Sequence, residues 1–200
     1  MKPSGAALTA VAAAAALAAC AAGAGATARA GSPAPELKAR TLKELPTPLP
    51  RPYDEAATPA QVNARIDAAF ARARASHKRV IIDLGGNWCS WCRLLAAVMD
   101  LPEARPFMAA HFEVVSVPVS SREDRRDDQN RQVLRRFGLK KADGYPYLVV
   151  AEPDGRILAR SSAVTDDRHH TPQAMLDWIA QFATPAHPVK TAAKSREVAS

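Results

Sequence analysis

Cysteine is scarce in this sequence, whose 200 residues include only Cys20, Cys89 and Cys92. Cys89 and Cys92 have the spacing of half a zinc site, but no further cysteine and no suitably spaced histidine pair completes it. Covalent haem attachment would need a histidine after Cys92, where the sequence has Arg93. We therefore expect no metal and no cofactor, which leaves the thiols themselves as the reactive groups.

Long apolar runs are also absent. An uncharged and largely apolar stretch covers 6–19, after Lys2, and it is shorter than the roughly 20 residues that a membrane-spanning helix needs. No second segment is long enough to cross a membrane. A basic start, a short apolar core and small residues at its end are typical of an export signal, which we predict for 1–19.

The predicted signal ends in Leu17-Ala18-Ala19-Cys20, which resembles the lipobox of bacterial lipoproteins. The resemblance implies that Cys20 becomes the lipidated first residue and holds the chain on the periplasmic side of a bacterial membrane. Lipidation would also account for the odd thiol and leave Cys89 and Cys92 as one pair. The alternatives are a retained anchor, or cleavage later, for example after 28–30, which would give a soluble periplasmic or secreted protein.

The net charge of +7 is not concentrated in the way that nucleic-acid binding requires. The basic residues are dispersed, and no compact cluster of Lys and Arg with interleaved aromatic residues is present. We expect no nucleic-acid partner and interpret the charge as a solvated surface, favoured by proximity to anionic lipid.

Composition divides the chain into a tether, one domain and a tail. Residues 20–57 are rich in Ala, Gly and Pro, which predicts an extended tether between membrane and domain. Residues 185–200 are small or polar and are predicted to be a disordered tail. The intervening 58–184 has the size of one ordinary domain.

Helical and strand patterns alternate within this domain. The expected elements are a helix from Thr58-Pro59, a strand at 79–84, helices at 89–99 and 103–112, a strand at 113–119, a helix at 132–137, a hairpin of strands at 147–152 and 156–161, and a helix after Thr171-Pro172. Strands separated by helices favour parallel pairing, and the hairpin adds an antiparallel pair. The order predicts an α/β domain with a mixed central sheet and helices on both faces.

The segment Trp88-Cys89-Ser90-Trp91-Cys92 stands where the first strand ends and a helix begins. Unpaired backbone N–H groups and the helix dipole at that position stabilise a thiolate, which is the nucleophile in disulfide exchange. The spacing therefore predicts one reactive cysteine with a second cysteine within reach.

Three features together resemble the thioredoxin superfamily over nearly all of 58–184. The first is this cysteine pair at a strand-to-helix junction. The second is Asp83, six positions before Cys89, where thioredoxins carry a buried acid. The third is Gly144-Tyr145-Pro146-Tyr147, which matches the segment that holds the family's cis-proline. The resemblance implies a thioredoxin-like three-layer fold. It also implies that Cys89 attacks, that Cys92 resolves the mixed disulfide, and that Asp83 exchanges a proton with Cys92.

The same resemblance suggests how a substrate would be held. A cis bond before Pro146 would turn the backbone of Tyr145 toward the sulfurs, where an extended substrate strand could pair with it. Trp88 and Trp91 are predicted to form an apolar surface around Cys89, with the ring of Trp91 exposed and Trp88 the better candidate for core packing. His169-His170 is expected to lie on the surface.

The resemblance implies a thiol–disulfide oxidoreductase that reduces or exchanges disulfides in exported proteins. A membrane thiol–disulfide carrier would supply electrons, because the periplasm is kept oxidising. Ser90-Trp91 between the cysteines differs from the Gly-Pro of thioredoxins and the Pro-His of strong oxidases, and we favour a reducing or isomerising direction. The alternatives are a non-enzymatic module that binds a partner protein or copper through both thiolates, and a purely structural disulfide.

Overall fold

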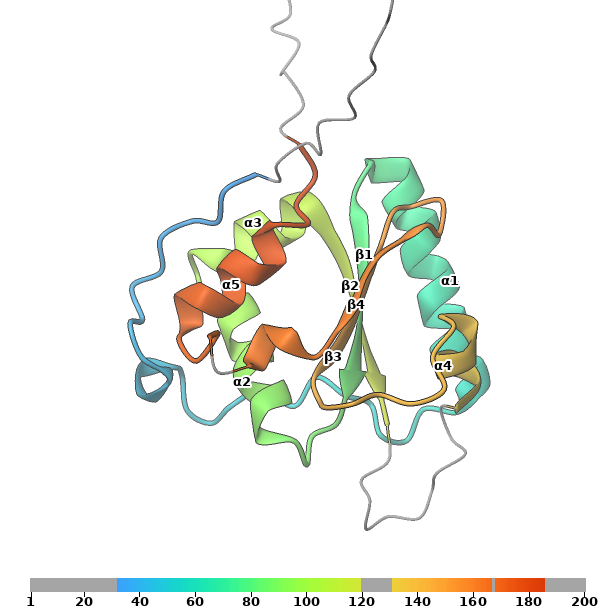
Figure 1. The fold of residues 1–200 in the computed structure, drawn as a ribbon, viewed down its shortest axis with the longest axis horizontal. Coiled ribbons are helices and arrows are strands. Elements are labelled where there is room, and N and C mark those ends of the chain that lie inside the picture. The colour runs from blue at the N-terminus through green and yellow to red at the C-terminus, as the bar shows by residue number, and fades with distance from the viewer. Residues whose placement is uncertain (1–31, 120–130, 167, 186–200) are drawn as a thin grey trace, which may run out of the picture.

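A mixed four-stranded sheet forms the middle layer of the computed structural model, which describes residues 32–119, 131–166 and 168–185 (Figure 1). The strands are β1 (Arg79–Gly85), β2 (Phe112–Pro118), β3 (Tyr147–Ala151) and β4 (Ile157–Ser161), in the order β2-β1-β3-β4. The predicted signal at 1–19, Cys20 and the tail beyond 185 lie outside the described residues.

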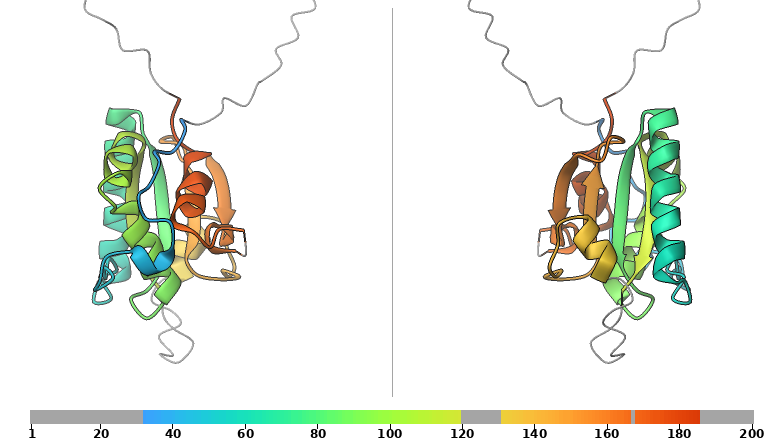
Figure 2. Two further views of the ribbon diagram at one scale, coloured as in Figure 1. Left: turned by 90° about the vertical axis from the view of Figure 1, so that its left-hand side faces the viewer. Right: turned by 90° about the vertical axis from the view of Figure 1, so that its right-hand side faces the viewer.

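Helices cover both faces of this sheet (Figures 1 and 2). One face is covered by α1 (Pro59–Ser76) and α4 (Arg131–Arg136), and the other by α2 (Ser90–Met99), α3 (Ala104–His111) and α5 (Pro172–Ala180). Each interface between sheet and helices contains its own apolar core. The predicted three-layer α/β fold is thereby confirmed. In the described ranges, no helix has the length and apolar character needed to cross a membrane.

The residues that begin and end the helices act as the sequence predicts. The Thr58 side chain accepts a hydrogen bond from the backbone N–H of Gln61, whose side chain in turn accepts one from the Thr58 backbone, which is a capping box. Thr171 caps α5 in the same position before a proline. Gly138 ends α4 with a φ of 70°, a conformation that glycine adopts without steric cost.

The strand pairing follows the prediction on one side of β1 only. β1 runs parallel to β2, with α2 and α3 as the crossover, and β3 and β4 form the predicted antiparallel hairpin. β3, however, pairs antiparallel with β1 rather than parallel to its predecessor β2. The pattern of helices and strands did not predict this, because a helical connection allows either direction when the next strand is placed on the opposite edge of β1.

The predicted tether is wrong for its described part, 32–57. This segment lies along the α2, α3 and α5 layer and contains only a short 3₁₀ turn, η1 (Leu42–Glu44). Leu37, Leu45 and Tyr53 are buried, with Leu37 only 1% exposed. Prolines exclude a regular helix here but do not prevent an extended segment from packing its few large apolar side chains against a neighbouring layer.

Hydrogen bonds also tie this N-terminal segment, 32–57, to α5. The Gln173 side chain accepts a hydrogen bond from the Leu37 backbone N–H at 2.8 Å and donates to the Pro35 carbonyl at 3.1 Å. The Ser32 hydroxyl donates to the Thr184 carbonyl at 2.9 Å. The segment is therefore part of the folded domain, which begins well before residue 58.

We expect Leu37→Ala to lower the free energy of unfolding by about 2–5 kcal/mol, because it removes a fully buried side chain. Lys38→Ala next to it is the control, since it removes only an exposed ion pair with Glu103. Urea unfolding followed by tryptophan fluorescence measures both. Equal stability of the two variants would mean that the segment does not contribute to the core.

Candidate active site

The cysteine pair lies where β1 passes into α2, as predicted. Cys89 is the N-cap of α2, and its sulfur accepts a hydrogen bond from the backbone N–H of Cys92 at 3.1 Å. The two sulfurs are bonded in a disulfide whose Cα atoms are 5.2 Å apart. When the disulfide is reduced, the same N–H and the helix dipole would stabilise a thiolate on Cys89.

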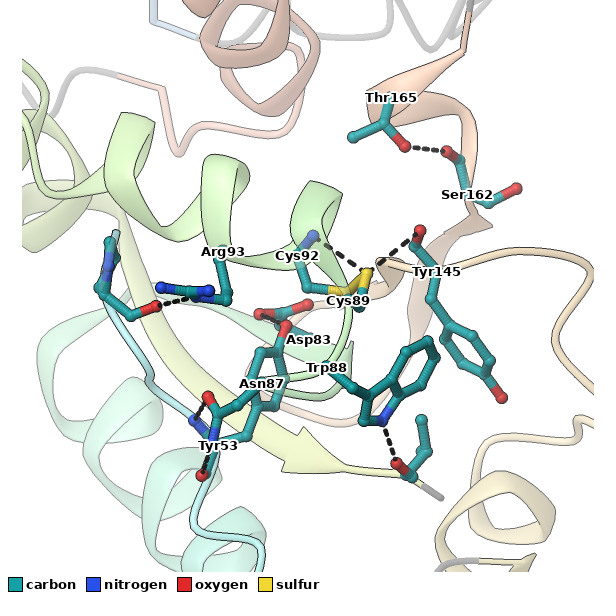
Figure 3. Close-up of a disulfide and its surroundings, with 12 residues drawn as sticks. Tyr53, Asp83, Asn87, Trp88, Cys89, Cys92, Arg93, Tyr145, Ser162 and Thr165 are labelled. Atoms are coloured by element: carbon teal, nitrogen blue, oxygen red, sulfur yellow. Dashed lines mark hydrogen bonds between the residues drawn. A yellow bond between two sulfur atoms is a disulfide. The ribbon is translucent and has the colours of Figure 1, made fainter. Parts of the chain in front are cut away.

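The two cysteines differ in their access to solvent. Cys89 is 7% exposed, whereas Cys92, one turn into the helix, is fully buried. The Cys89 sulfur lies 3.7 Å from the carbonyl oxygen of Tyr145, and the peptide bond between Tyr145 and Pro146 is cis, as the resemblance implied (Figure 3). A group that reaches this pair from outside therefore meets Cys89 and the Tyr145 backbone first.

Asp83 lies in β1 directly below the pair and is completely buried. Its Oδ2 accepts a hydrogen bond from the Tyr53 hydroxyl at 2.7 Å, and its Oδ1 has no hydrogen-bond partner among the described residues. Burial raises the pKa of Asp83 to about 7, and the hydrogen bond from Tyr53 opposes this rise. The carboxyl group can therefore gain or lose a proton near neutral pH, which is the property that proton exchange with a thiol requires.

Two glycines allow this close packing. A Cβ atom on Gly85 would lie 2.5 Å from the Tyr53 hydroxyl oxygen and 2.7 Å from the Cys92 sulfur, which is closer than real contacts allow. A Cβ atom on Gly86 would overlap the indole ring of Trp88. Any larger residue at either position would displace a side chain of the site.

The two tryptophans around Cys89 match the prediction only in part. Trp88 is the exposed ring, at 47%, and its Nε1 donates to the Val119 carbonyl at 3.1 Å. Trp91 is half-buried and stacks on His170, with ring centroids 5.0 Å apart. The predicted surface position thus holds for Trp88, and its core-packing alternative is wrong. The exposed ring predicted for Trp91 is wrong, because the first turn of α2 directs Trp91 toward the loop before α5.

Trp88 and the half-buried Tyr145 nevertheless stand together beside the pair. Their rings meet edge to face at a centroid distance of 5.8 Å (Figure 3). His170 lies on the surface, as expected, but it contacts the site through Trp91. The structure thus brings together all the predicted site residues that it describes: Asp83, Trp88, Cys89, Trp91, Cys92, Tyr145 and Pro146.

The N-terminal segment contributes to the site, and sequence reasoning missed this entirely. The Asn87 side chain donates to the Tyr53 carbonyl at 2.7 Å and accepts from the Tyr53 N–H at 3.3 Å. The Arg93 guanidinium donates to the carbonyls of Leu49 and Pro50 at 2.9 Å and 3.1 Å. The large apolar residues of the segment were a signal of packing, but their irregular spacing shows no periodicity that would indicate where they pack.

Within the ranges that the structure describes, no group of three or more His, Cys, Asp and Glu side chains could hold a metal ion.

Comparisons with known proteins agree with this geometry. Residues 61–153 match the Thioredoxin-like family. The chain is 24% identical over 94 residues to the disulfide bond reductase DsbH of Chlamydia pneumoniae, a match that covers 46% of this chain and 57% of that protein. It thus spans little more than half the length of this curated relative. The chain is also similar to the crystal structure of a disulphide isomerase from Xylella fastidiosa Temecula1. The two are 29% identical, with a TM-score of 0.56, and the match covers 66% of this chain and 97% of the isomerase.

The buried Asp83 predicts a pH-dependent stability of the oxidised protein. An unfolded aspartate has a pKa near 3.9, so the folded state binds more protons than the unfolded state as the pH rises from about 4 to 7. Stability is lost over this window, by about 4 kcal/mol in total for a pKa near 7. The free energy of unfolding of Asp83→Asn should therefore rise relative to that of the parent as the pH rises. The difference between the two should level off above pH 7.

Urea unfolding of the parent and of Asp83→Asn at a series of pH values measures this difference. Asp177→Asn, which changes an exposed acid on α5, controls for the loss of one negative charge. Parallel pH curves for the parent and Asp83→Asn would contradict the raised pKa.

Gly85→Ala should lower the free energy of unfolding by about 1–3 kcal/mol, because the new methyl group overlaps Tyr53 and Cys92. Gly144→Ala is the milder control, since its Cβ would meet Ser162 at 3.3 Å. Adding Tyr53→Phe to Gly85→Ala should lower stability by less than the sum of the two single effects, because the hydroxyl oxygen no longer meets the new methyl group. Additive effects of the two substitutions in chemical unfolding would argue against this contact.

Proposed function

The chain carries a thioredoxin-like domain of the kind found in thiol–disulfide oxidoreductases, and we propose that its Cys89–Cys92 pair exchanges disulfides with exported proteins. The observation that carries the proposal is the asymmetry of the pair. Cys89 caps the helix beside the Tyr145 carbonyl, while Cys92 is fully buried behind it near a carboxyl group that titrates near neutral pH.

The reaction proceeds in two exchanges. The Cys89 thiolate attacks a substrate disulfide, forms a mixed disulfide and releases one substrate sulfur as a thiolate. Cys92 then loses its proton and attacks the Cys89 sulfur, which closes the Cys89–Cys92 disulfide and releases the second substrate sulfur. The substrate gains two electrons and the pair loses two.

The direction that we propose is reduction or isomerisation. It is supported by Ser90-Trp91 between the cysteines, and by the names of two similar proteins, a disulfide bond reductase and a disulphide isomerase. A reductase must be reduced again after each turnover, and in an oxidising compartment this calls for a dedicated donor. We propose a membrane thiol–disulfide carrier for this role.

Attachment to the membrane through a lipid on Cys20 would place the pair on the periplasmic side. This part of the proposal is supported by the lipobox-like Leu17-Ala18-Ala19-Cys20 at the end of the predicted signal. Ser32, the first residue that the structure describes, already donates to the Thr184 carbonyl, so at most the short stretch between Cys20 and Ser32 would separate the lipid from the folded domain.

The two cysteines should fail in different ways when each is replaced. Cys89→Ser is expected to abolish insulin disulfide reduction, whereas Cys92→Ser should attack once and accumulate the mixed disulfide. Turbidity measures insulin reduction, and mass spectrometry of acid-quenched samples detects the mixed disulfide. Cys20→Ala is the matched control, with turnover equal to that of the parent. Undiminished turnover of Cys89→Ser would rule out the proposed function.

The direction of electron flow is tested by the reduction potential of the pair. Known catalysts range from about −270 mV for thioredoxin to about −120 mV for the strong oxidant DsbA. We expect a value in the reducing half of this range, measured by equilibration with glutathione buffers and mass-spectrometric counting of alkylated thiols. A potential close to that of the strong oxidant would reverse the proposed direction while leaving the exchange chemistry intact.

A further inference from the structure

We propose that Tyr53 is a positioning residue, which the N-terminal segment places against Asp83 and which controls the exchange of a proton between Asp83 and Cys92. The inference rests on the proposed redox function of the Cys89–Cys92 pair. It concerns a residue outside the region that matches the Thioredoxin-like family, since that match begins at residue 61.

The first observation is the hydrogen bond itself. The Tyr53 hydroxyl donates to Asp83 Oδ2 at 2.7 Å, and both side chains are buried. In the described part of the chain, Asp83 Oδ1 has no hydrogen-bond partner. The hydroxyl thus occupies one oxygen and leaves the other as the free position for a proton.

The second observation is the position of the Cys92 sulfur. The Tyr53 hydroxyl oxygen and the Cys92 sulfur crowd the same side of Gly85, at 2.5 Å and 2.7 Å from where its Cβ would stand. Figure 3 shows the Tyr53 ring pointing from the N-terminal segment to the Asp83 carboxyl group, beside the disulfide. Phenol, carboxyl and sulfur therefore share one buried space.

The elements around Asp83 supply few other groups that could hydrogen-bond to its carboxyl group. α2 contributes Cys89 and Cys92, and its Arg93 guanidinium is bonded to backbone carbonyls of the N-terminal segment. β2 and β3 place Ser116 and Leu148 beside Asp83 in the sheet. Of the residues described, Tyr53 alone is hydrogen-bonded to the Asp83 carboxyl group.

The position of Tyr53 is itself held by the active-site loop. The Asn87 side chain forms two hydrogen bonds with the Tyr53 backbone, and the Asn87 N–H donates to the Glu55 carboxylate at 2.9 Å. The loop between β1 and Cys89 therefore fixes the segment that supplies the phenol.

These contacts assign Tyr53 a defined effect on the resolving step. The Asp83 carboxylate takes the proton from the Cys92 thiol, and Cys92 then displaces the substrate sulfur from Cys89. A hydrogen bond to the charged form of an acid favours ionisation. Tyr53 therefore keeps more Asp83 in the carboxylate form at neutral pH than burial alone would allow.

Tyr53→Phe removes the hydroxyl and retains the ring. Reduced protein in a Cys20→Ala background is mixed with an equimolar chromogenic aryl disulfide, which releases one coloured thiolate when Cys89 attacks and a second when Cys92 resolves. We expect the pH midpoint of the second release to move upward and its rate at pH 7 to fall about threefold to tenfold, since one pKa unit is worth a factor of ten. The first release should change less.

Tyr147→Phe is the matched control, because Tyr147 belongs to the core on the opposite face of the sheet. Its pH midpoint should equal that of the parent. A second variant, Asn87→Ala, loosens the hold on Tyr53 and should move the midpoint upward by a smaller amount. Equal midpoints for the parent, Tyr53→Phe and Asn87→Ala, with cooperative unfolding of all three, would overturn the role of Tyr53.

The same assay separates this inference from the proposed function. Cys92→Ser must lose the second release if the pair works as proposed. A second release that persists in Cys92→Ser would overturn the redox mechanism. A second release that is lost in Cys92→Ser but is unmoved by Tyr53→Phe would overturn only the role of Tyr53.

Discussion

The hydrogen bond between the Tyr53 hydroxyl and the Asp83 carboxyl group joins three parts of the chain that are far apart in sequence. Tyr53 comes from the N-terminal segment, Asp83 from the central strand, and Cys92 beside them from the helix that follows. A buried carboxyl group without a partner costs several kcal/mol. The phenol reduces this cost, so the site can retain a buried acid without converting it permanently to its neutral form.

The rest of the active site is arranged around the space that this bond requires. Gly85 leaves room for the phenol and the Cys92 sulfur, and Gly86 leaves room for Trp88. The cap of α2 holds the Cys89 sulfur next to the Tyr145 carbonyl, on the more accessible side of the pair. The complete burial of the Cys92 sulfur and the slight exposure of the Cys89 sulfur follow from the same strand-to-helix junction.

Local features of the sequence were sufficient for most of the fold. Thr58 and Thr171 begin helices, Gly138 ends one, and Gly155 turns the hairpin, because each acts on backbone groups within a few residues. The position of β3 in the sheet could not be predicted in this way, since a helical connection does not determine which edge of β1 receives the next strand. Trp91 was assigned the wrong exposure, because the direction of a side chain in the first turn of a helix is decided only when the helix is packed.

The sequence by itself determined the cysteine pair and its place before a helix, because these depend on a short spacing and on chain order, and its resemblance to the thioredoxin superfamily indicated the buried acid and the cis-proline. Only the tertiary structure decided that the proline-rich segment before residue 58 belongs to the domain and brings Tyr53 to Asp83. That contact spans 30 residues of sequence and has no periodic pattern. It exists because the segment buries Leu37, Leu45 and Tyr53 against helices and strands that form elsewhere in the chain.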